Sequence, residues 1–203
     1  MSHLALVRHG KSSWNHLGLW TGLTDVDLVE EGRVEARQTA ELLRSYHFHQ
    51  AFTSELKRTH QTLEEILKTL ERTVSWEIDA ALNERHYGIH TGKNKWEIKD
   101  SIGEEAFQAI RRGWDVPIEG GETLKDVYNR IVPFYQNRVI PFCKTQSNIL
   151  VVAHGNSLRA LIKHLESVND EDIANVEIGT GEAVIYNLSK EGEVISKELR
   201  GSI

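Results

Sequence analysis

The chain has 203 residues, of which 39% are hydrophobic, and it carries a formal net charge of −6. That length can bury one sizeable core, and no stretch rich in proline, glycine and serine offers a linker, so residues 1–203 are expected to form a single domain. The acidic balance argues against nucleic acid as a partner, because nucleic-acid backbones are bound by clustered lysine and arginine. Any anion-binding site must therefore be local.

The N-terminal sequence enters an apolar run directly after Met1-Ser2-His3. A signal peptide would place a basic segment before a longer apolar stretch, and a membrane span needs roughly 20 apolar residues. Neither pattern is found in the sequence. We therefore expect a cytoplasmic protein that has no membrane partner.

Metal binding and redox chemistry find little support in the residue pattern. Cys143 is the only cysteine, which excludes an intrachain disulfide and a thiolate cluster. His47 with His49, and His86 with His90, are the pairs closest to ligand spacing, but neither has a third ligand at suitable spacing. We predict no metal.

The first half of the chain predicts strands followed by helices. Residues 4–7 form an apolar run typical of a buried strand, and a helix with Ala36 and Leu43 on one face follows a polar segment. Residues 51–53 predict a second strand. Ser54 is placed to cap the next helix, which carries an apolar stripe.

The second half continues the alternation. Residues 74–78 predict a strand, residues 93–113 a charged helical region, and the segment from Thr123 a longer helix that Pro133 should kink. The remaining strands are expected at 149–153, 183–188 and 194–199, with a helix after the first of them. Such alternation is typical of a three-layer α/β fold, in which helices cover both faces of a mainly parallel central sheet.

Two of the apolar strands end in the same dipeptide. Residues 4–7 lead through Arg8 to His9-Gly10, and residues 149–153 lead to His154-Gly155. One such pair is weak evidence, because His-Gly after a strand is more often a simple loop start. In open α/β sheets, however, ligands bind beyond the carboxyl ends of the strands, so both imidazoles are expected to share one crevice.

The segment Arg-His-Gly-Lys-Ser-Ser-Trp-Asn at residues 8–15 resembles the phosphohistidine signature of the histidine phosphatase superfamily. Arg58 after a strand, Glu84 in mid-chain and His154 late in the chain follow in the order expected of that superfamily. Within it, the chain resembles the 2,3-bisphosphoglycerate-dependent phosphoglycerate mutases more than the general phosphatases. The segments that carry this likeness are Thr21-Gly22, residues 82–88, Asn94-Lys95, Arg111-Arg112-Gly113 and residues 154–159.

The resemblance implies a role for each matching residue. His9 would be the nucleophile that carries the phosphoryl group, Glu84 the general acid and base, and Arg8, Arg58 and His154 the groups that hold the transferred phosphoryl oxygens. The positions implied in substrate binding are Ser12, Asn15, Thr21, Gly22, Tyr87, Lys95, Arg111, Arg112, Gly155 and Asn156.

The implied activity is the interconversion of 3-phosphoglycerate and 2-phosphoglycerate in glycolysis and gluconeogenesis, primed by 2,3-bisphosphoglycerate as cofactor. The partners would be phosphorylated sugar acids, and the same resemblance implies a homodimer. A bisphosphoglycerate carries roughly four to five negative charges. Five cationic side chains are available to meet them, namely Arg8, Arg58, Lys95, Arg111 and Arg112.

Two other functions remain open at this point. A histidine phosphatase would let water attack phosphorylated His9 and release phosphate from small esters. A non-catalytic module would only bind phosphorylated ligands, but the joint presence of His9, Glu84 and His154 speaks against it. Tyr87, Lys95 and the Arg111-Arg112 pair favour the mutase, because simple hydrolysis needs no clamp at the far end of the substrate.

The chain also departs from the family pattern. Lys11 stands where an acidic or neutral polar residue is usual, the segment between Trp114 and Gly121 is short, and only residues 200–203 follow the last expected strand. We therefore expect residues 88–120, rather than the tail, to build the lid that keeps water from the site.

Overall fold

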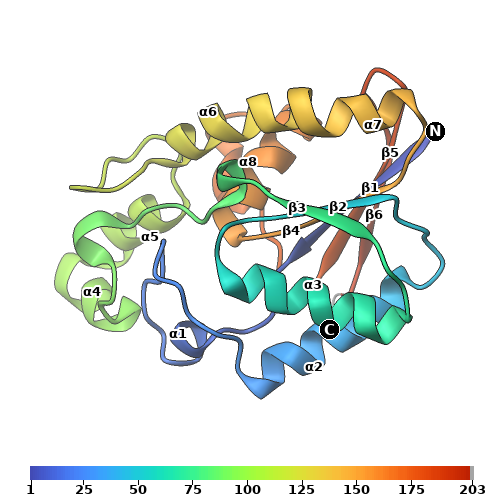
Figure 1. The fold of residues 1–203 in the computed structure, drawn as a ribbon. Helices are drawn as coiled ribbons and strands as arrows, with labels where there is room; N and C mark the ends of the chain where they lie inside the picture. Colours follow the sequence, from blue (N-terminus) through green and yellow to red (C-terminus); the bar gives the residue numbers. More distant parts are fainter. Residues whose placement is uncertain (202–203) are drawn as a thin grey trace.

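The computed structural model describes residues 1–201 and contains one mixed six-stranded sheet (Figure 1). The spatial order of its strands is β3-β2-β4-β1-β5-β6. The first four of these run parallel, whereas β5 is antiparallel to both β1 and β6. The strands are β1 (Ser2–Arg8), β2 (Gln50–Thr53), β3 (Ser75–Ile78), β4 (Ile149–Ala153), β5 (Ala183–Leu188) and β6 (Val194–Arg200).

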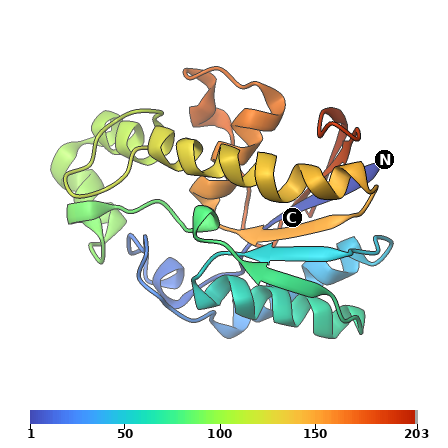
Figure 2. The ribbon, with the colours of Figure 1, turned by 45° about the horizontal axis from the view of Figure 1, so that its top comes forward.

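Helices cover both faces of this sheet, which confirms the predicted three-layer α/β architecture (Figures 1 and 2). Helices α2 and α3 lie on one face, and α6 and α8 lie on the other. The α-helices are α1 (Ser13–His16), α2 (Glu30–Leu43), α3 (Lys57–Leu70), α4 (Lys95–Ile102), α5 (Glu104–Arg112), α6 (Leu124–Phe134), α7 (Ile140–Lys144) and α8 (Gly155–Glu166). Short 3₁₀ turns span Ala80–Leu82, Gly88–His90 and Asp172–Asn175.

Residues 4–7 of β1 and all of β4 are apolar, as expected for strands that are buried on both faces. In β1, Leu4 and Leu6 enter the core beneath α6 and α8, while Ala5 and Val7 enter the core beneath α2 and α3. Burying a side chain of the size of Leu or Val contributes about 1.5–3 kcal/mol. The two cores together hold the carboxyl edge of the parallel strands in place.

The start of α3 differs from the sequence prediction. This helix begins at Lys57 with Leu56 as its N-cap, and no side chain caps it. The predicted cap, Ser54, instead accepts a hydrogen bond at Oγ from the Leu56 amide at 3.1 Å and lies 2.8 Å from Nε2 of His154. The prediction was wrong because the Ser54 hydroxyl is hydrogen-bonded to His154, at the end of the neighbouring strand β4, and does not cap the helix.

The predicted helical region at residues 93–113 is divided into two short helices. Gly103 separates α4 from α5 and has a φ of 84°, in the left-handed region that favours glycine. These helices lie beyond the carboxyl ends of the strands, toward which the arrowheads of β2, β3 and β4 point (Figure 2). The sheet edge and the α4–α5 segment therefore face the same region.

The other long helix also loses its regularity near the predicted place. Pro133 lies inside α6, which ends at Phe134 and continues as a π turn, Tyr135–Val139, into α7. In the described part of the chain, no helix combines the length and the hydropathy that a membrane span requires. Of the short tail expected after the last strand, residues 202–203 lie outside the described residues.

Candidate active site

One cleft at the carboxyl edge of the parallel strands collects most of the predicted site residues. It encloses about 690 Å³, including its open mouth. Six of its side chains are cationic and two are acidic, so positive charge is focused locally in a chain whose net charge is negative. The lining residues are Arg8, His9, Asn15, Trp20, Thr21, Gly22, Arg58, Glu84, Tyr87, Lys95, Arg111, Arg112, Gly155, Asn156, Arg159, Glu177 and Ile178.

His9 follows β1 and is 3% exposed. Its Nδ1 lies 2.7 Å from the carbonyl oxygen of Gly10, which can only accept, so Nδ1 carries the proton and donates it. Burial, with Arg58 and Arg8 nearby, holds the pKa of His9 well below its usual value. The imidazole is therefore neutral near pH 7, and its Nε2 keeps a free lone pair.

His154 lies directly behind His9. The two rings pack edge to face with centroids 4.9 Å apart, so the strand-end histidines are in contact, but the fully buried His154 does not itself line the cleft. Burial and the proximity of Arg58 also lower the pKa of His154. Its Nε2 is held by Ser54 at 2.8 Å, and its buried Nδ1 has no hydrogen-bond partner among the described residues.

Two arginines from different elements are fixed by backbone carbonyls. Arg58, in the first turn of α3, donates from its two Nη atoms to Thr24 and Gly22, each at 2.9 Å. Arg8 donates from Nη1 to Ile178 at 2.9 Å. Burial lowers the pKa of Arg58 to about 10, so it remains charged near neutrality. Within residues 1–201, the buried Nε of each arginine has no partner.

Glu84 is held by the N-terminus of α8. Its Oε1 accepts hydrogen bonds from the Arg85 amide at 2.8 Å, the Asn156 amide at 3.2 Å and the Asn156 Nδ2 at 3.1 Å. A Cβ atom placed on Gly155 would lie 3.8 Å from Oε2 of Glu84 and 3.6 Å from Nε of Arg8. Both distances are ordinary van der Waals contacts, so the carboxylate and the guanidinium both lie next to Gly155.

The side chains that α4 and α5 contribute to the cleft are cationic, and we call them, together with Tyr87, the clamp end. Lys95 begins α4, and Arg111 and Arg112 end α5. Burial, with Arg111 nearby, lowers the pKa of Lys95 to about 8, and burial also lowers the pKa of Arg111. The hydroxyl of Tyr87 accepts a hydrogen bond of 2.7 Å from Asn156 Nδ2, which links this end to Glu84.

Ser12 is the predicted substrate-binding residue that stays outside the cleft lining. Its fully buried side chain caps α1, and its Oγ donates to Oδ1 of Asn15 at 2.9 Å. Asn15 does line the cleft. The structure therefore places Ser12 behind Asn15, as a residue that orients it.

Sequence reasoning missed two charged residues of the cleft. Arg159 lies one turn after Asn156 on α8 and donates to its Oδ1 at 3.0 Å, to the Arg112 carbonyl at 2.8 Å and to the Ile173 carbonyl at 2.7 Å. Its three-residue spacing from Asn156 was a usable signal. Glu177 lies in the loop before β5 and pairs with Arg112 at 2.7 Å, and no pattern in the sequence marks it.

The described residues contain no group of three or more histidine, cysteine, aspartate and glutamate side chains arranged to hold a metal ion. The side chains that line the cleft beside the neutral imidazole of His9 are mainly nitrogen donors, together with the carboxylates of Glu84 and Glu177. Such a set is suited to binding phosphate groups and moving a proton.

Comparisons with known proteins agree with this chemistry. The sequence model of the histidine phosphatase superfamily (branch 1) matches residues 4–198. The 2,3-bisphosphoglycerate-dependent phosphoglycerate mutase of Cytophaga hutchinsonii is 44% identical over 93% of this chain and 89% of its own length. The corresponding mutase of Mesorhizobium japonicum is 44% identical over 97% of each chain.

A solved structure extends the likeness to the fold. The alpha-ribazole phosphatase of Shigella flexneri superposes with a TM-score of 0.79 at 25% identity, covering 95% of this chain and 94% of that one. The phosphatase thus shares the architecture, whereas the curated mutases are far closer in sequence. The chain belongs to the histidine phosphatase superfamily and, within it, to the 2,3-bisphosphoglycerate-dependent phosphoglycerate mutases.

Proposed function

We propose that this protein interconverts 3-phosphoglycerate and 2-phosphoglycerate through a phosphohistidine at His9, in glycolysis and gluconeogenesis. One observation carries the proposal. One cleft is lined by Arg8, His9, Arg58 and Glu84, which with the buried His154 packed against His9 we call the transfer end, and by Tyr87, Lys95, Arg111 and Arg112, which form the clamp end. A substrate with a phosphate at one end and a carboxylate at the other matches this two-ended arrangement.

The residues of the cleft fit 2,3-bisphosphoglycerate. The buried Nε atoms of Arg8 and Arg58 and the Oγ1 of Thr21 have no partner in the described part of the chain. A buried donor left without a partner costs free energy, and phosphate oxygens are strong acceptors for it. When bound, 2,3-bisphosphoglycerate would supply the phosphoryl group that primes His9.

His9 is set up as the nucleophile. The hydrogen bond from Nδ1 to Gly10 fixes the ring and leaves the lone pair of Nε2 free to attack phosphorus. A bond from Nε2 to phosphorus forms as the ester oxygen departs. In the return step the hydroxyl oxygen of the bound sugar acid attacks the same phosphorus, and the imidazole leaves.

Glu84 would carry the proton in both directions. Its protonated carboxyl gives a proton to the departing ester oxygen, and its carboxylate takes one from the attacking hydroxyl. Three N–H groups hold Oε1, so Oε2 is the oxygen left to exchange the proton. Because Glu84 sits beside Arg8 across Gly155, proton transfer and phosphoryl transfer take place at neighbouring atoms.

Arg8, Arg58 and His154 would stabilise the transferring phosphoryl group. Charge spreads over its three oxygens in a loose transition state, and fixed donors act there without reorganising. Backbone carbonyls already anchor both guanidinium groups, and Ser54 anchors His154. Asn15, Thr21, Gly22, Gly155 and Asn156 are proposed as further contacts to the substrate.

Several predictions from the sequence await their own experiments. We propose phosphorylated sugar acids as the substrates. A homodimer, a cytoplasmic location, and the absence of nucleic-acid and membrane partners stay predictions, as does the absence of a metal cofactor. We also propose that α4 and α5, within the expected lid region, limit the access of water to phosphorylated His9.

A paired assay tests the proposed function. Conversion of 3-phosphoglycerate and release of inorganic phosphate are measured on the same preparation, with and without 2,3-bisphosphoglycerate. We expect conversion to depend on 2,3-bisphosphoglycerate and to exceed phosphate release. Phosphate release that exceeds conversion, with no stimulation by 2,3-bisphosphoglycerate, would instead establish a phosphatase.

A further inference from the structure

A carboxylate lies among the cations of the clamp end. Glu177 lines the cleft and accepts a hydrogen bond of 2.7 Å at Oε1 from Nη2 of Arg112. The side chain of Glu177 is 61% exposed, whereas that of Arg112 is 18% exposed. Arg112 is one of the cations assigned to the substrate. Glu177 therefore occupies a hydrogen-bonding position on Arg112 that an oxygen of the ligand could take.

The Arg112–Glu177 pair also lies between two hollows. Both residues border the catalytic cleft and a second, open hollow lined by Gln108, Ala109, Ala174 and Asn175. The exposed Glu177 side chain thus has space on the far side of Arg112. It can turn out of the catalytic cleft by rotating its own torsions.

The end of α5 does not depend on Glu177 for its position. Arg159 donates to the carbonyl of Arg112 at 2.8 Å, and Arg85 donates to the carbonyl of Ile110 at 2.7 Å. Two cations thus bind the C-terminal carbonyls of this helix, where its dipole is negative. The contribution of Glu177 is therefore its charge.

We infer, on the basis of the proposed function, that Glu177 is a specificity-determining residue. It competes with the ligand's distal anionic group for Arg112, and it thereby weakens binding of the bisphosphate more than binding of the monophosphate. Repulsion from one negative charge grows with the charge of the ligand. A bisphosphoglycerate carries roughly four to five negative charges and a monophosphoglycerate roughly two and a half to three.

This competition suits a mutase that works in the presence of its priming compound. A cleft with six cations holds the most highly charged ligand most tightly, which would exclude the monophosphate substrate. When the distal phosphate leaves, Glu177 returns to Arg112 and stabilises the emptied clamp. The residue thus narrows the difference in affinity between the two ligands.

Binding measured without turnover tests the inference. Calorimetry gives Kd for 2,3-bisphosphoglycerate and for 3-phosphoglycerate in proteins that all carry His9→Ala, which prevents transfer. The proteins compared are the His9→Ala parent and its further variants Glu177→Gln, Glu177→Asp and Glu171→Gln. Glu171→Gln is a control that removes an exposed charge outside the cleft. We expect Glu177→Gln to tighten the bisphosphate about tenfold and the monophosphate about threefold, with a smaller gap at high salt.

The two controls are expected to keep the parent ratio of the two Kd values. If Glu177→Gln weakens both ligands, or changes them by the same factor, the inference is wrong and Glu177 acts only as a structural partner of Arg112. The proposed function fails instead if the His9→Ala parent binds neither ligand while the protein that retains His9 still binds vanadate. The two failures are thus distinguishable.

Discussion

The transfer end and the clamp end of the cleft are built in different ways. At the transfer end, His9 is 3% exposed, Arg58 1% and His154 0%, and each follows a strand of the central sheet. At the clamp end, Lys95 and Arg111 lie on two short helices joined at Gly103. The first set is fixed by the sheet and its two cores, whereas the second depends on a small segment beyond the sheet edge.

This difference suggests how one fold serves more than one reaction. Chemistry at His9 requires atoms held to a few tenths of an ångström, which packed strands and anchored arginines provide. Under the proposed function, ligand choice depends on the cations that α4 and α5 contribute to the cleft. The Shigella flexneri phosphatase keeps the architecture at 25% identity, as expected if the sheet edge is shared and the clamp varies.

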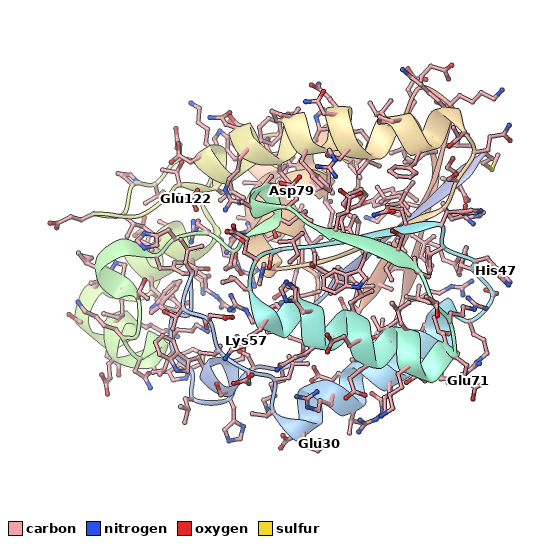
Figure 3. The ribbon with its side chains drawn as sticks, in the orientation of Figure 1. Glu30, His47, Lys57, Glu71, Asp79 and Glu122 are labelled. Carbon is pink, nitrogen blue, oxygen red and sulfur yellow. The ribbon has the colours of Figure 1, made fainter. Side chains whose placement is uncertain are left out.

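The largest effect should come from His9→Ala, which removes the nucleophile. We expect loss of acid-labile phosphoryl label from 2,3-bisphosphoglycerate and a fall in turnover of more than about 10⁴-fold. The control is His47→Ala, an exposed histidine at the end of the molecule away from α4 and α5 (Figure 3). Stoichiometric labelling of His9→Ala would show that a residue other than His9 carries the phosphoryl group.

Glu84→Gln should have the next largest effect. Glutamine keeps an oxygen for the three N–H groups that hold Oε1 but has no transferable proton. Turnover should fall by about 10²- to 10⁴-fold with little change in substrate binding. Glu71→Gln, at an exposed helix end (Figure 3), serves as the matched control. Parent-like turnover in Glu84→Gln would require a different acid.

Arg111→Ala separates the two ends most clearly. Arg111 lines the clamp end, so its loss should weaken 3-phosphoglycerate binding about 10- to 100-fold, the cost of one hydrogen bond between charged groups. Binding of vanadate, which reaches only the transfer end, should change less than threefold. Kd values for both ligands provide the check, and equal losses would place Arg111 in the transfer site.

The smallest effect concerns pH. The Lys95 ammonium has a pKa lowered to about 8 by burial and by Arg111, so it loses its positive charge as pH rises through 8. KM for 3-phosphoglycerate should therefore stay level below pH 8 and then rise by no more than about tenfold in all, because only one of the six cations of the cleft loses its charge. In Lys95→Arg the charge persists, and the KM profile should stay level to pH 9.5. A rise that survives in Lys95→Arg would exclude Lys95 as its source.

The sequence predicts the transfer end well because its residues depend on local patterns. Apolar runs mark the strands, and a residue after a strand end must lie at the sheet edge, so His9, Arg58 and His154 could be brought together on paper. Ser54 shows where this reasoning stops. Its position suited a helix cap, but its partner is His154, which lies 100 residues further along the chain.

The clamp end was predictable only through family resemblance. Charged residues at 95, 111 and 112 look like ordinary solvated helix positions, and nothing local shows that they face one cleft. Glu177 is harder still, because its partner Arg112 lies 65 residues away in a different element. The break between α4 and α5, by contrast, had a signal in the sequence, because Gly103 can adopt the left-handed φ of 84° that ends a helix.

The fate of the phosphoryl group on His9 tests the separation of the two ends most directly. Protein that carries a radioactive phosphoryl group on His9 is mixed with 3-phosphoglycerate. The label is then measured in phosphorylated sugar acids and in inorganic phosphate. We predict that the parent delivers most of the label to sugar acid. Arg111→Ala should shift it toward inorganic phosphate, while label loss without 3-phosphoglycerate keeps its parent rate. An unchanged division in Arg111→Ala, or a parent that delivers its label mainly to water, would contradict the account.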